Sequence, residues 1–474
     1  MNTRKMSLLK LLKDEDLERI HLASVEILAK TGMIFHSQDA LGIFKTHGFK
    51  VIDKTVFFTK KDVDDALKTC PSTFKWRARK ETASVTVGEG VLVQPGGGSV
   101  YIQDIEQGRR EGRLQDFINI QKLYQSSDVV DMVGFSPVDA CDIDQDSKSL
   151  DMQFEILKNT DKPIHGHVCG GKRAAEMLEM ARIAFGEDDI FETSHIMGLS
   201  INPKSPLSIA DDQISTLIEY VERNQIILPA PLSIGGVSGP LNPIGITTLV
   251  NAETLGVLVL TQLIKPGAPV LPAIGSSFAY MKNAAYCTGT PDQMLHEIIN
   301  IQLVRDFYHL PTRINAGMCD AKTVDAQAGL ETMQNVLMGV LAGCNMIAHT
   351  MGVLDAIMTI SYEKMIIDEE ILKRALYLSK PVNFTEEDLG VQLIGEIGHG
   401  GNFIAHDNTL KNCRSVFQPG VSHWGSYEDW FSKGAEDITV RANRAYKERL
   451  AAAPDSYLLP EVEKELQDYI RTVR

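Results

Sequence analysis

The sequence lacks the closely spaced cysteine pairs of zinc ribbons and redox motifs, and it lacks a glycine-rich phosphate loop. Its seven cysteines are scattered without a CxxC pair, a pattern that favours free thiols in a reducing cytoplasm. The glycine clusters at 96–98 and 395–401 match neither a Walker A loop nor a GxGxxG fingerprint. We therefore interpret both clusters as loops that approach a ligand or partner closely.

Long uninterrupted hydrophobic runs are also missing. The most apolar stretch, residues 245–265, is interrupted by Asn251, Glu253 and Gln262, so we expect a buried helix there and no membrane span. The first twenty residues contain no sustained apolar segment and soon become acidic, which argues against a secretory signal. We expect a cytoplasmic protein.

Positive charge is in deficit, because 47 Lys and Arg stand against 62 Asp and Glu, a formal net charge of −15. Such a chain repels a phosphate backbone, so we expect no nucleic acid as a partner. The acidity suits a cationic ligand, although solubility alone also explains it. With 44% hydrophobic and 23% charged residues, the chain has the composition of an ordinary globular protein.

Eight short apolar runs recur along the chain, with starts roughly 30 to 44 residues apart. That spacing is about one strand plus one crossover helix, and eight such units build a (β/α)8 barrel, an α/β fold also called a TIM barrel. The runs are VYIQD (100–104), DMVGFSP (131–137), PIHGHVC (163–169), HIMGLSIN (195–202), QIILPAPLS (225–233), PVLPAIGSS (269–277), PTRINAG (311–317) and CNMIAHT (344–350).

A barrel of this kind carries its chemistry where the strands end. We expect the helices at 114–126, 146–159, 171–186, 211–224, 244–265, 291–309, 325–342 and 362–378. The residues at or near the predicted C-terminal strand ends are Gln103, Ser136, His167, Asn202, Ser233, Ser276, Asn315 and His349.

The remainder of the chain flanks the barrel. Residues 1–95 predict helices at 14–32, 35–48 and 59–69, followed by a β-hairpin over 83–93 that forms a lid at one mouth. Residues 96–380 form the barrel, and residues 381–474 form a C-terminal extension packed on it. That extension contains a glycine-rich loop at 395–401 and an aromatic cluster at 424–431, which we expect at a partner or dimer interface.

Three groups of residues are chemical candidates. His165, His167 and Cys169 alternate along one strand, so their side chains are expected to share a face and to offer zinc ligands for a hydrolase. Residues 313–322 combine a cation, an amide, a thiol and a carboxylate at one strand end, with a structural Arg313–Asp320 ion pair as the alternative. His349 ends the eighth strand, beside the first strand with Tyr101 and Gln103.

Longer motifs resemble one particular family. They run from about residue 10 to the C-terminus and are densest over 230–445. These motifs are KPGAPV (265–270), Gly289-x-Pro291, Asp320-Ala321-Lys322, Asp325-x-Gln327-Ala328-Gly329-x-Glu331, Gly343-Cys344-Asn345 with His349, Glu363-Lys364, GHGGNF (398–403), Thr409, Arg414, Trp430 and Asp437 with Arg441-Ala442. In these motifs the chain resembles the trimethylamine methyltransferase superfamily.

The resemblance implies a (β/α)8 enzyme that moves a methyl group from a methylated amine to Co(I) of a separate corrinoid protein. Founding members carry pyrrolysine near strand seven, whereas this chain reads straight through Asn315, Ala316, Gly317, Cys319 and Asp320. It is therefore similar to the members that demethylate quaternary amines. A quaternary ammonium releases a neutral tertiary amine, so its demethylation requires no general acid.

The resemblance also sets the expected ligands. Glycine betaine is the first choice, with proline betaine, carnitine and butyrobetaine as alternatives, and a non-catalytic amine-binding relative remains a competing hypothesis. We expect no bound metal, a corrinoid supplied by the partner protein, and a homo-oligomer. Aromatic faces hold methylammonium groups, and cations and amides hold carboxylates. The candidate substrate-binding residues are Tyr101, Gln103, Phe135, His167, Arg313, Asn315 and His349.

Overall fold

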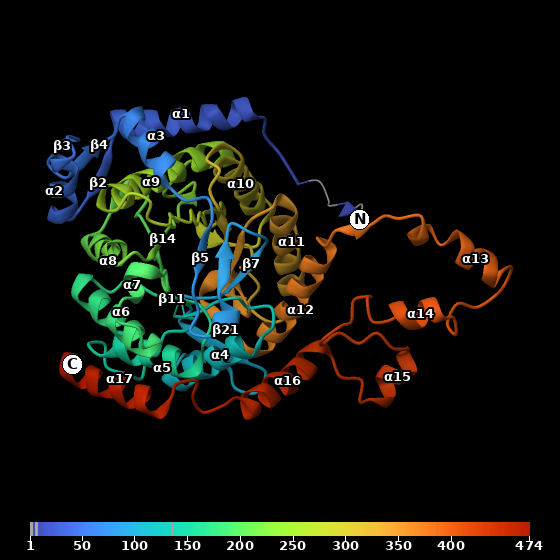
Figure 1. Ribbon diagram of the computed structural model, residues 1–474. Helices are drawn as coiled ribbons and strands as arrows, with labels where there is room; N and C mark the ends of the chain where they lie inside the picture. Colours follow the sequence, from blue (N-terminus) through green and yellow to red (C-terminus); the bar gives the residue numbers. More distant parts are fainter. Residues whose placement is uncertain (1–2, 5–7, 135) are drawn as a thin grey trace.

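The computed structural model describes residues 3–4, 8–134 and 136–474, and its centre is a closed ring of eight parallel segments (Figure 1). Residues 269–273 form the sixth segment, through backbone hydrogen bonds from Ile227 to Pro269 and from Arg313 to Pro272. The ring closes where Met346 pairs with Leu92. The other segments are β7 (Leu92–Pro95), β10 (Val133–Gly134), β11 (Ile164–His165), β12 (Met197–Ile201), β14 (Ile226–Pro229), β18 (Arg313–Ile314) and β19 (Met346–Thr350).

The predicted (β/α)8 fold is confirmed, but the predicted first strand is wrong. Residues 101–104 form β8 (Tyr101–Asp104), which pairs with β9 (Gly108–Glu111) and β21 (Thr359–Ser361) outside the ring. The first barrel strand is β7, whose four residues are all buried, whereas β8 alternates between half-buried and buried residues. A parallel barrel strand is covered on both faces, so continuous burial is its expected pattern.

One helix follows each barrel strand, as predicted to within a few residues. Side-chain caps start several of them: Asn242 and Thr290 each accept a backbone N–H one turn into the helix, and proline follows both. The eight are α4 (Leu114–Ser126), α5 (Lys148–Asn159), α6 (Gly171–Phe185), α8 (Asp211–Glu222), α9 (Pro243–Ile264), α10 (Pro291–Gln302), α11 (Ala326–Ala342) and α12 (Tyr362–Leu378).

Helix α9 is the one helix of the described residues that is long and apolar enough to span a membrane by length and composition. The structure buries 83% of its most apolar window. The prediction of a buried barrel helix at this position is confirmed.

The N-terminal part forms a small layer against α9. Its three predicted helices correspond to α1 (Asp14–Lys30), α2 (Gln38–Thr46) and α3 (Lys60–Thr69). Between them lies a sheet of β2 (Met33–Phe35), β4 (Thr55–Phe57) and β3 (Lys50–Ile52), extended by β13 (Ser208–Ile209) from the barrel part.

The predicted hairpin over 83–93 is wrong in its strands. Instead, β6 (Val85–Val87) pairs with β5 (Phe74–Trp76), and the chain then enters β7 of the barrel. The β5–β6 hairpin closes the N-terminal end of the ring: Trp76 is wholly buried there, and a Cβ on Gly198 of β12 would overlap its indole ring. A plug of this kind at the N-terminal face serves stability.

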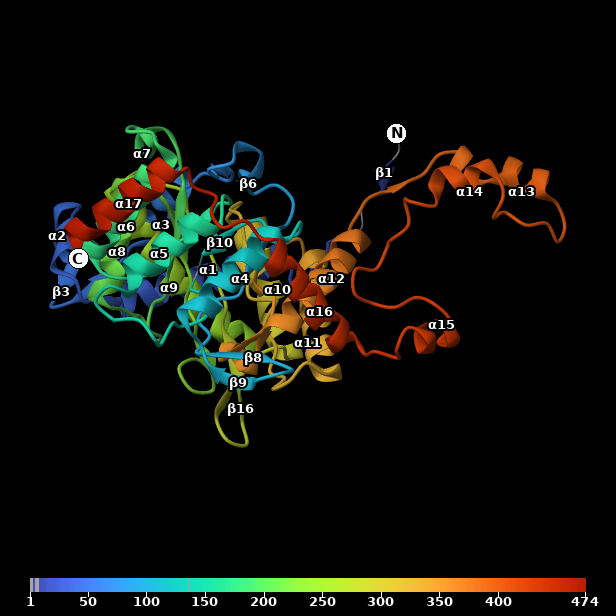
Figure 2. The same cartoon turned by 90° about the horizontal axis from the view of Figure 1, so that it is seen from below.

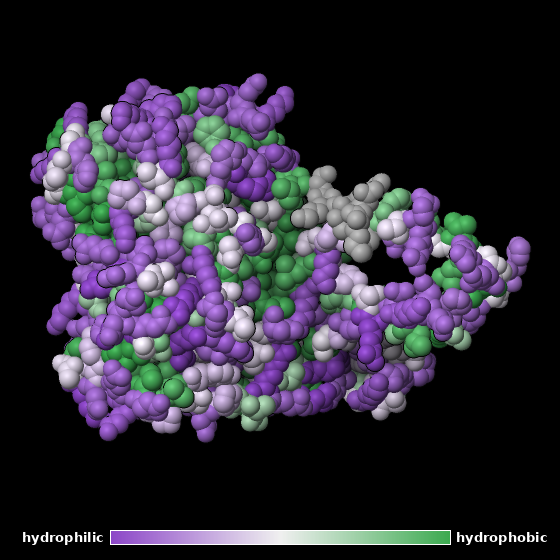
Figure 3. Space-filling model, viewed as in Figure 1, coloured by the Kyte–Doolittle hydropathy of each residue, from purple (hydrophilic) through white to green (hydrophobic). Residues whose placement is uncertain are grey.

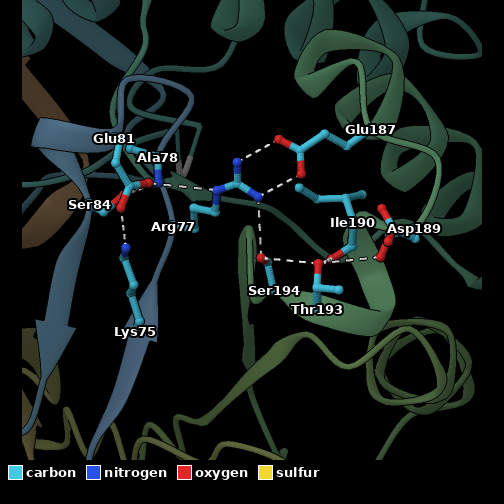
Figure 4. Close-up of polar contacts among 10 residues, drawn as sticks. All are labelled: Lys75, Arg77, Ala78, Glu81, Ser84, Glu187, Asp189, Ile190, Thr193 and Ser194. Carbon is cyan, nitrogen blue, oxygen red and sulfur yellow. Dashed lines mark hydrogen bonds and ion pairs between the residues drawn. The ribbon is translucent and has the colours of Figure 1, made fainter.

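A salt bridge fastens this plug to the outer layer (Figure 4). The Arg77 guanidinium donates to both carboxylate oxygens of Glu187, at 2.8 and 2.5 Å, and it also reaches Ser194 beyond α7 (Ile190–Thr193). The bidentate geometry fixes the direction in which the hairpin enters the barrel.

Two groups of short strands stand on the opposite, C-terminal side of the ring, at the lower edge of Figure 2. One contains β8, β9 and β21, together with β20 (Val353–Leu354). The other contains β15 (Ile234–Gly235), β16 (Ser277–Tyr280) and β17 (Ala285–Cys287).

The C-terminal part leaves the barrel after α12 and returns to it. Strand β22 (Val382–Asn383) pairs with β1 (Thr3–Arg4), and then α13 (Val391–Ile397), α14 (Asp407–Asn412) and α15 (Tyr427–Ser432) project sideways (Figure 1). Helix α16 (Ile438–Ala452) packs on α12, and α17 (Pro460–Val473) packs on α6. The division of the chain at residues 95 and 380 stays a proposal, with β7 just on the N-terminal side of the first boundary.

Glu369 joins α12 to α16 and makes the fold sensitive to acid. Its carboxylate accepts from Arg449 at 2.6 Å and from Lys373 at 2.8 Å. Burial alone would raise the pKa of Glu369, but these two partners lower it to about 2. A carboxylate with a lowered folded pKa stabilises the fold above its unfolded pKa of about 4.3, and that contribution is lost as the pH falls towards 2.

We therefore predict that Glu369→Gln lowers the free energy of unfolding at pH 7 by about 2 kcal/mol and flattens its decline between about pH 4.5 and 2. Urea unfolding across this pH range measures both effects. Glu26→Gln, which removes only an exposed pair with Lys30, is the matched control and should change little. Equal pH profiles for Glu369→Gln and the wild type would contradict the assignment.

Candidate active site at the C-terminal end of the barrel

A cavity of about 190 Å³ lies where the barrel strands end. A larger groove of about 680 Å³ lies between α1 and α9, but it is outside the ring and far from the strand ends. The smaller cavity is the candidate site because its walls come from five successive strand ends and from the loops after β7 and β19. The lining residues are Gly97, Gly98, Ser200, Asn202, Ala230, Leu232, Ala273, Gly275, Arg313, Asn315, His349 and Ile357.

Arg313 is the charged residue of this wall and is only 2% exposed. Its Nε donates to Oε1 of Gln94 at 2.5 Å, and its Nη1 donates to Oδ1 of Asn315 at 3.1 Å. Burial lowers the pKa of Arg313 to about 10, against the opposing effect of Glu297, so the guanidinium stays protonated at neutral pH.

Glu297 lies behind this wall on α10 and accepts the backbone N–H of Asn315 at 3.3 Å. Burial raises its pKa to about 8, so most of this carboxyl is protonated at pH 7. None of the twelve lining residues, all of them described, is Asp or Glu. The cavity therefore carries net positive charge and favours an anionic group.

Two histidines lie beside the guanidinium. His165 Nε2 lies 3.1 Å from the hydroxyl of Ser200, and its ring lies 6.3 Å from that of Trp76. Burial lowers the pKa of His165 to about 3, and burial, with the charge of Arg313, holds the pKa of His349 well below its usual value. Both imidazoles are neutral at pH 7 and offer hydrogen bonds without charge.

The chain after strand eight is strained. His349, Met351, Asp355, Ala356 and Ile357 all have positive φ, between 49° and 81°. A left-handed conformation is costly for residues other than glycine, above all for a β-branched one, and such strain gathers at functional sites. Here it turns Ile357 into the wall of the cavity.

Three contacts hold this strained segment in place. Asp368 accepts the N–H of Gly352 at 2.7 Å, and its carboxylate is paired at 2.7 Å with Lys364 in full burial. Asp355 forms ion pairs with Lys322 at 2.8 Å and Arg109 at 3.3 Å. The loop is thus fixed from α12 on one side and from the mouth hairpin on the other.

The structure brings together three of the predicted substrate-binding residues, Arg313, Asn315 and His349. It places three others elsewhere. Tyr101 and Gln103 lie on the outer strand β8, where the guanidinium of Arg109 covers the Tyr101 ring at 3.6 Å. His167 faces α5, where its Nε2 lies 3.1 Å from the Ser149 hydroxyl. Phe135 lies outside the described residues.

Sequence reasoning missed much of the cavity wall. Asn202 was expected at a strand end, but Gly97, Gly98, Gly275, Ser200 and Ile357 were not proposed as site residues. A signal did exist for the glycines: a Cβ on Gly275 would overlap the Asn315 amide, so only glycine leaves room for that side chain.

The stretch from Asn315 to Asp320, compared above with the pyrrolysine position, runs across the end of strand eight. The Gly317 N–H donates to Ala348 at 3.0 Å, and a Cβ on Gly317 would overlap the His349 backbone. The Cys319 thiol donates to the Val353 carbonyl at 3.2 Å, away from the cavity. Of this stretch, Asn315 lines the cavity and the other residues, including Ala316 and Asp320, do not.

The proposed zinc ligands do not converge. His165 faces Ser200, His167 faces Ser149, and the Cys169 sulfur lies 3.5 Å from that of Met177, with burial raising its pKa to about 12. The prediction of a shared face is wrong because β11 ends at His165 and the chain bends after it. Among the described residues no group of three or more His, Cys, Asp or Glu is arranged to hold a metal ion.

Comparison with known proteins decides the family. The sequence model of trimethylamine methyltransferase (MTTB) matches residues 1–474. The chain belongs to this family. The resemblance inferred from the motifs is thereby confirmed.

Several members of known activity are similar over their whole length. Glycine betaine methyltransferase of Desulfitobacterium hafniense is 33% identical, over 97% of this chain and 96% of the relative. L-carnitine:corrinoid methyltransferase of Eubacterium limosum is 27% identical over 97% and 95%. The crystal structure of monomethylamine methyltransferase from Methanosarcina barkeri, at 12% identity, matches with a TM-score of 0.53 over 95% of this chain and 89% of that one, a likeness of fold.

The buried pair of Lys364 and Asp368 generates a prediction about the site's support. Asp368→Asn leaves a buried ammonium without its counter-charge, so it should destabilise the protein by about 3–5 kcal/mol in urea unfolding. Asp128→Asn breaks an exposed pair with Lys373 and should cost less than about 1 kcal/mol. Similar losses for both variants would show that the buried pair does not support the strained loop.

Proposed function

We propose that this protein removes a methyl group from a betaine and transfers it to a corrinoid protein. A betaine joins a quaternary ammonium to a carboxylate. Family membership supports the reaction class, and the names of glycine betaine, L-carnitine and proline betaine methyltransferases among its relatives support the substrate class. The free state of all seven cysteines fits the cytoplasmic location that we propose with it.

The observation that carries the proposal is the buried, protonated Arg313 with Asn315 in a small cavity free of carboxylates. A guanidinium and an amide are the donors that recognise a carboxylate with fixed geometry. An ammonium without a carboxylate would meet only repulsion there. The cavity thus selects a zwitterion over trimethylamine.

The remaining walls suit the other end of a betaine. Ala230, Leu232, Ala273 and Ile357 are apolar and lie against N-methyl groups when Arg313 holds the carboxylate. The site would fix the carboxylate, turn one methyl group toward the open mouth, and exclude water around it. The small volume and the 33% identity both favour glycine betaine, with proline betaine, carnitine and butyrobetaine as larger alternatives.

The protonation states at the site fit this chemistry. Loss of a methyl group from a quaternary ammonium leaves a neutral tertiary amine, so no proton has to be supplied. The neutral His165 and His349 therefore suffice. The reduced corrinoid of the partner protein supplies the nucleophile, and this chain's residues bind and orient the methyl donor.

The partner must approach the mouth, and an exposed apolar rim lies there. It consists of Leu232, Val237, Leu241, Tyr280 and Met281, on the loop before α9 and on the β16–β17 hairpin. These segments touch one another, because a Cβ on Gly236 would contact both Leu241 and Met281. We propose this mouth rim as the docking surface of the corrinoid protein.

Substitution of Arg313 tests the substrate site. Arg313→Gln should weaken glycine betaine binding by about two to three orders of magnitude, since truncation of one partner of a buried charge pair costs about 2–5 kcal/mol. Titration calorimetry measures the change in Kd. Arg109→Gln, which removes an equal charge outside the cavity, should bind as the wild type does. Unchanged affinity in Arg313→Gln would overturn the proposed carboxylate site.

Substitution of Met281 tests the mouth rim. Met281→Glu places a charge on the apolar rim, so KM for the corrinoid protein should rise at least about tenfold while the Kd for glycine betaine stays the same. Leu330→Glu, on an equally exposed leucine of α11, is the control. An unchanged KM in Met281→Glu would place the docking surface elsewhere.

A further inference from the structure

Residues 384–436 form an arm that extends from the barrel without a core of its own. All of these residues are described, and Val421 is the only one of them that is buried. Figures 1 and 2 both show α13, α14 and α15 standing away from the other helices. Ordering a residue's backbone costs about 1–2 kcal/mol, and this arm buries almost nothing in return.

The arm nevertheless has a defined local structure. Thr385 and Asp388 cap each other's backbone N–H groups, and Ser426 caps α15 through the N–H of Asp429. His406 caps α14. Such caps select a conformation but add only about 1 kcal/mol each, so a surface outside this chain has to stabilise the arm.

The root of the arm is fixed on α12, which prevents it from folding back over its own barrel. Glu370 accepts the backbone N–H groups of Gly420, Val421 and Ser422, at 3.1, 2.7 and 2.9 Å. The guanidinium of Arg374 lies 5.2 Å from the ring of Phe417 and 5.4 Å from that of Trp424. These contacts set the direction in which the arm projects.

The arm exposes large apolar side chains, visible as green surface at the right of Figure 3. Ile404 is 77% exposed and Leu410 is 74% exposed. Soluble proteins rarely expose a series of this kind unless another protein covers it. The exposed set is Val391, Ile394, Ile404, Leu410, Val416, Trp424, Tyr427 and Phe431.

Its position excludes the mouth as the place of contact. In Figure 2 the mouth strands β8, β9 and β16 lie at the lower edge, whereas α13 and α14 lie at the upper right. A corrinoid protein seated on the mouth rim leaves the arm uncovered, and it must also dissociate in each cycle. An arm without a core requires a partner that stays bound.

We propose that a second copy of this chain covers the arm. Two copies related by a two-fold axis place each arm against the other copy, so that one set of contacts forms twice and covers both arms. Homodimer interfaces are rich in apolar residues and carry few charges at their centre, which fits the exposed set of the arm. The mouths of both barrels stay open to the corrinoid protein.

Sedimentation equilibrium of the full chain tests this proposal without substrate or corrinoid. The wild type should have the mass of a dimer, and the double variant Ile404→Glu/Leu410→Glu should be monomeric or associate at least about tenfold more weakly. Leu330→Glu, 69% exposed on the barrel, should remain a dimer. Circular dichroism and thermal unfolding check that each variant is folded.

Limited trypsin digestion adds a local readout, because Lys411 and Arg414 lie in the arm. Cleavage there should be slow in the wild type and fast in the double variant, with barrel sites unchanged. A wild type that is monomeric at micromolar concentrations, or a folded double variant with the wild-type mass, would overturn the proposal. Loss of corrinoid-protein binding from a monomeric wild type through these substitutions would assign the arm to that partner instead.

Discussion

The burial of one guanidinium governs the architecture of this protein's active end. A charge such as that of Arg313 is expensive to remove from water, so it requires donors and acceptors at fixed places around it. Gln94 of β7 and Asn315 next to β18 provide them from strands one and seven, and strand eight between them ends in the left-handed His349. The same side chain thereby closes the ring and leaves a positive, water-poor cavity.

The two ends of the barrel divide stability from chemistry. At the N-terminal end, Trp76 and the Arg77–Glu187 salt bridge seal the ring with a hairpin. At the C-terminal end, the ring stays open, and the cost of a buried cation and a strained loop is met by Lys364, Asp368 and the ion pairs of Asp355. That division is general for barrels of this type, and it leaves the mouth free for a large partner.

The sequence was sufficient to predict the barrel, because seven of the eight strand runs and all eight helices follow simple periodicities. The first strand was misplaced because Tyr101–Asp104 alternates well, whereas the true strand, Leu92–Pro95, is short and ends in proline. Arg313, Asn315 and His349 were predictable from strand-end position alone. His167 was not, because a bend after β11 reverses the expected alternation, and no periodicity reveals which residue faces the axis after a bend.

Glycine and strain hold the information that the sequence alone does not display. Gly275 gives space to the Asn315 amide, and Ile357 reaches the cavity only because the backbone adopts a positive φ. Both are consequences of tertiary contacts across the ring. The family comparison then supplies what geometry does not, the kind of reaction that a cavity shaped for a carboxylate performs.

The most direct test of the account is a methyl-transfer measurement with purified protein, a corrinoid protein reduced to Co(I), and glycine betaine labelled with 13C in its methyl groups. The account predicts that the label appears as methyl-cobalt, with one dimethylglycine formed per methyl transferred. Proline betaine, carnitine and butyrobetaine are assayed in parallel. Binding of a betaine with an unchanged cobalt spectrum for all four compounds would contradict it and leave a protein that binds amines without demethylating them.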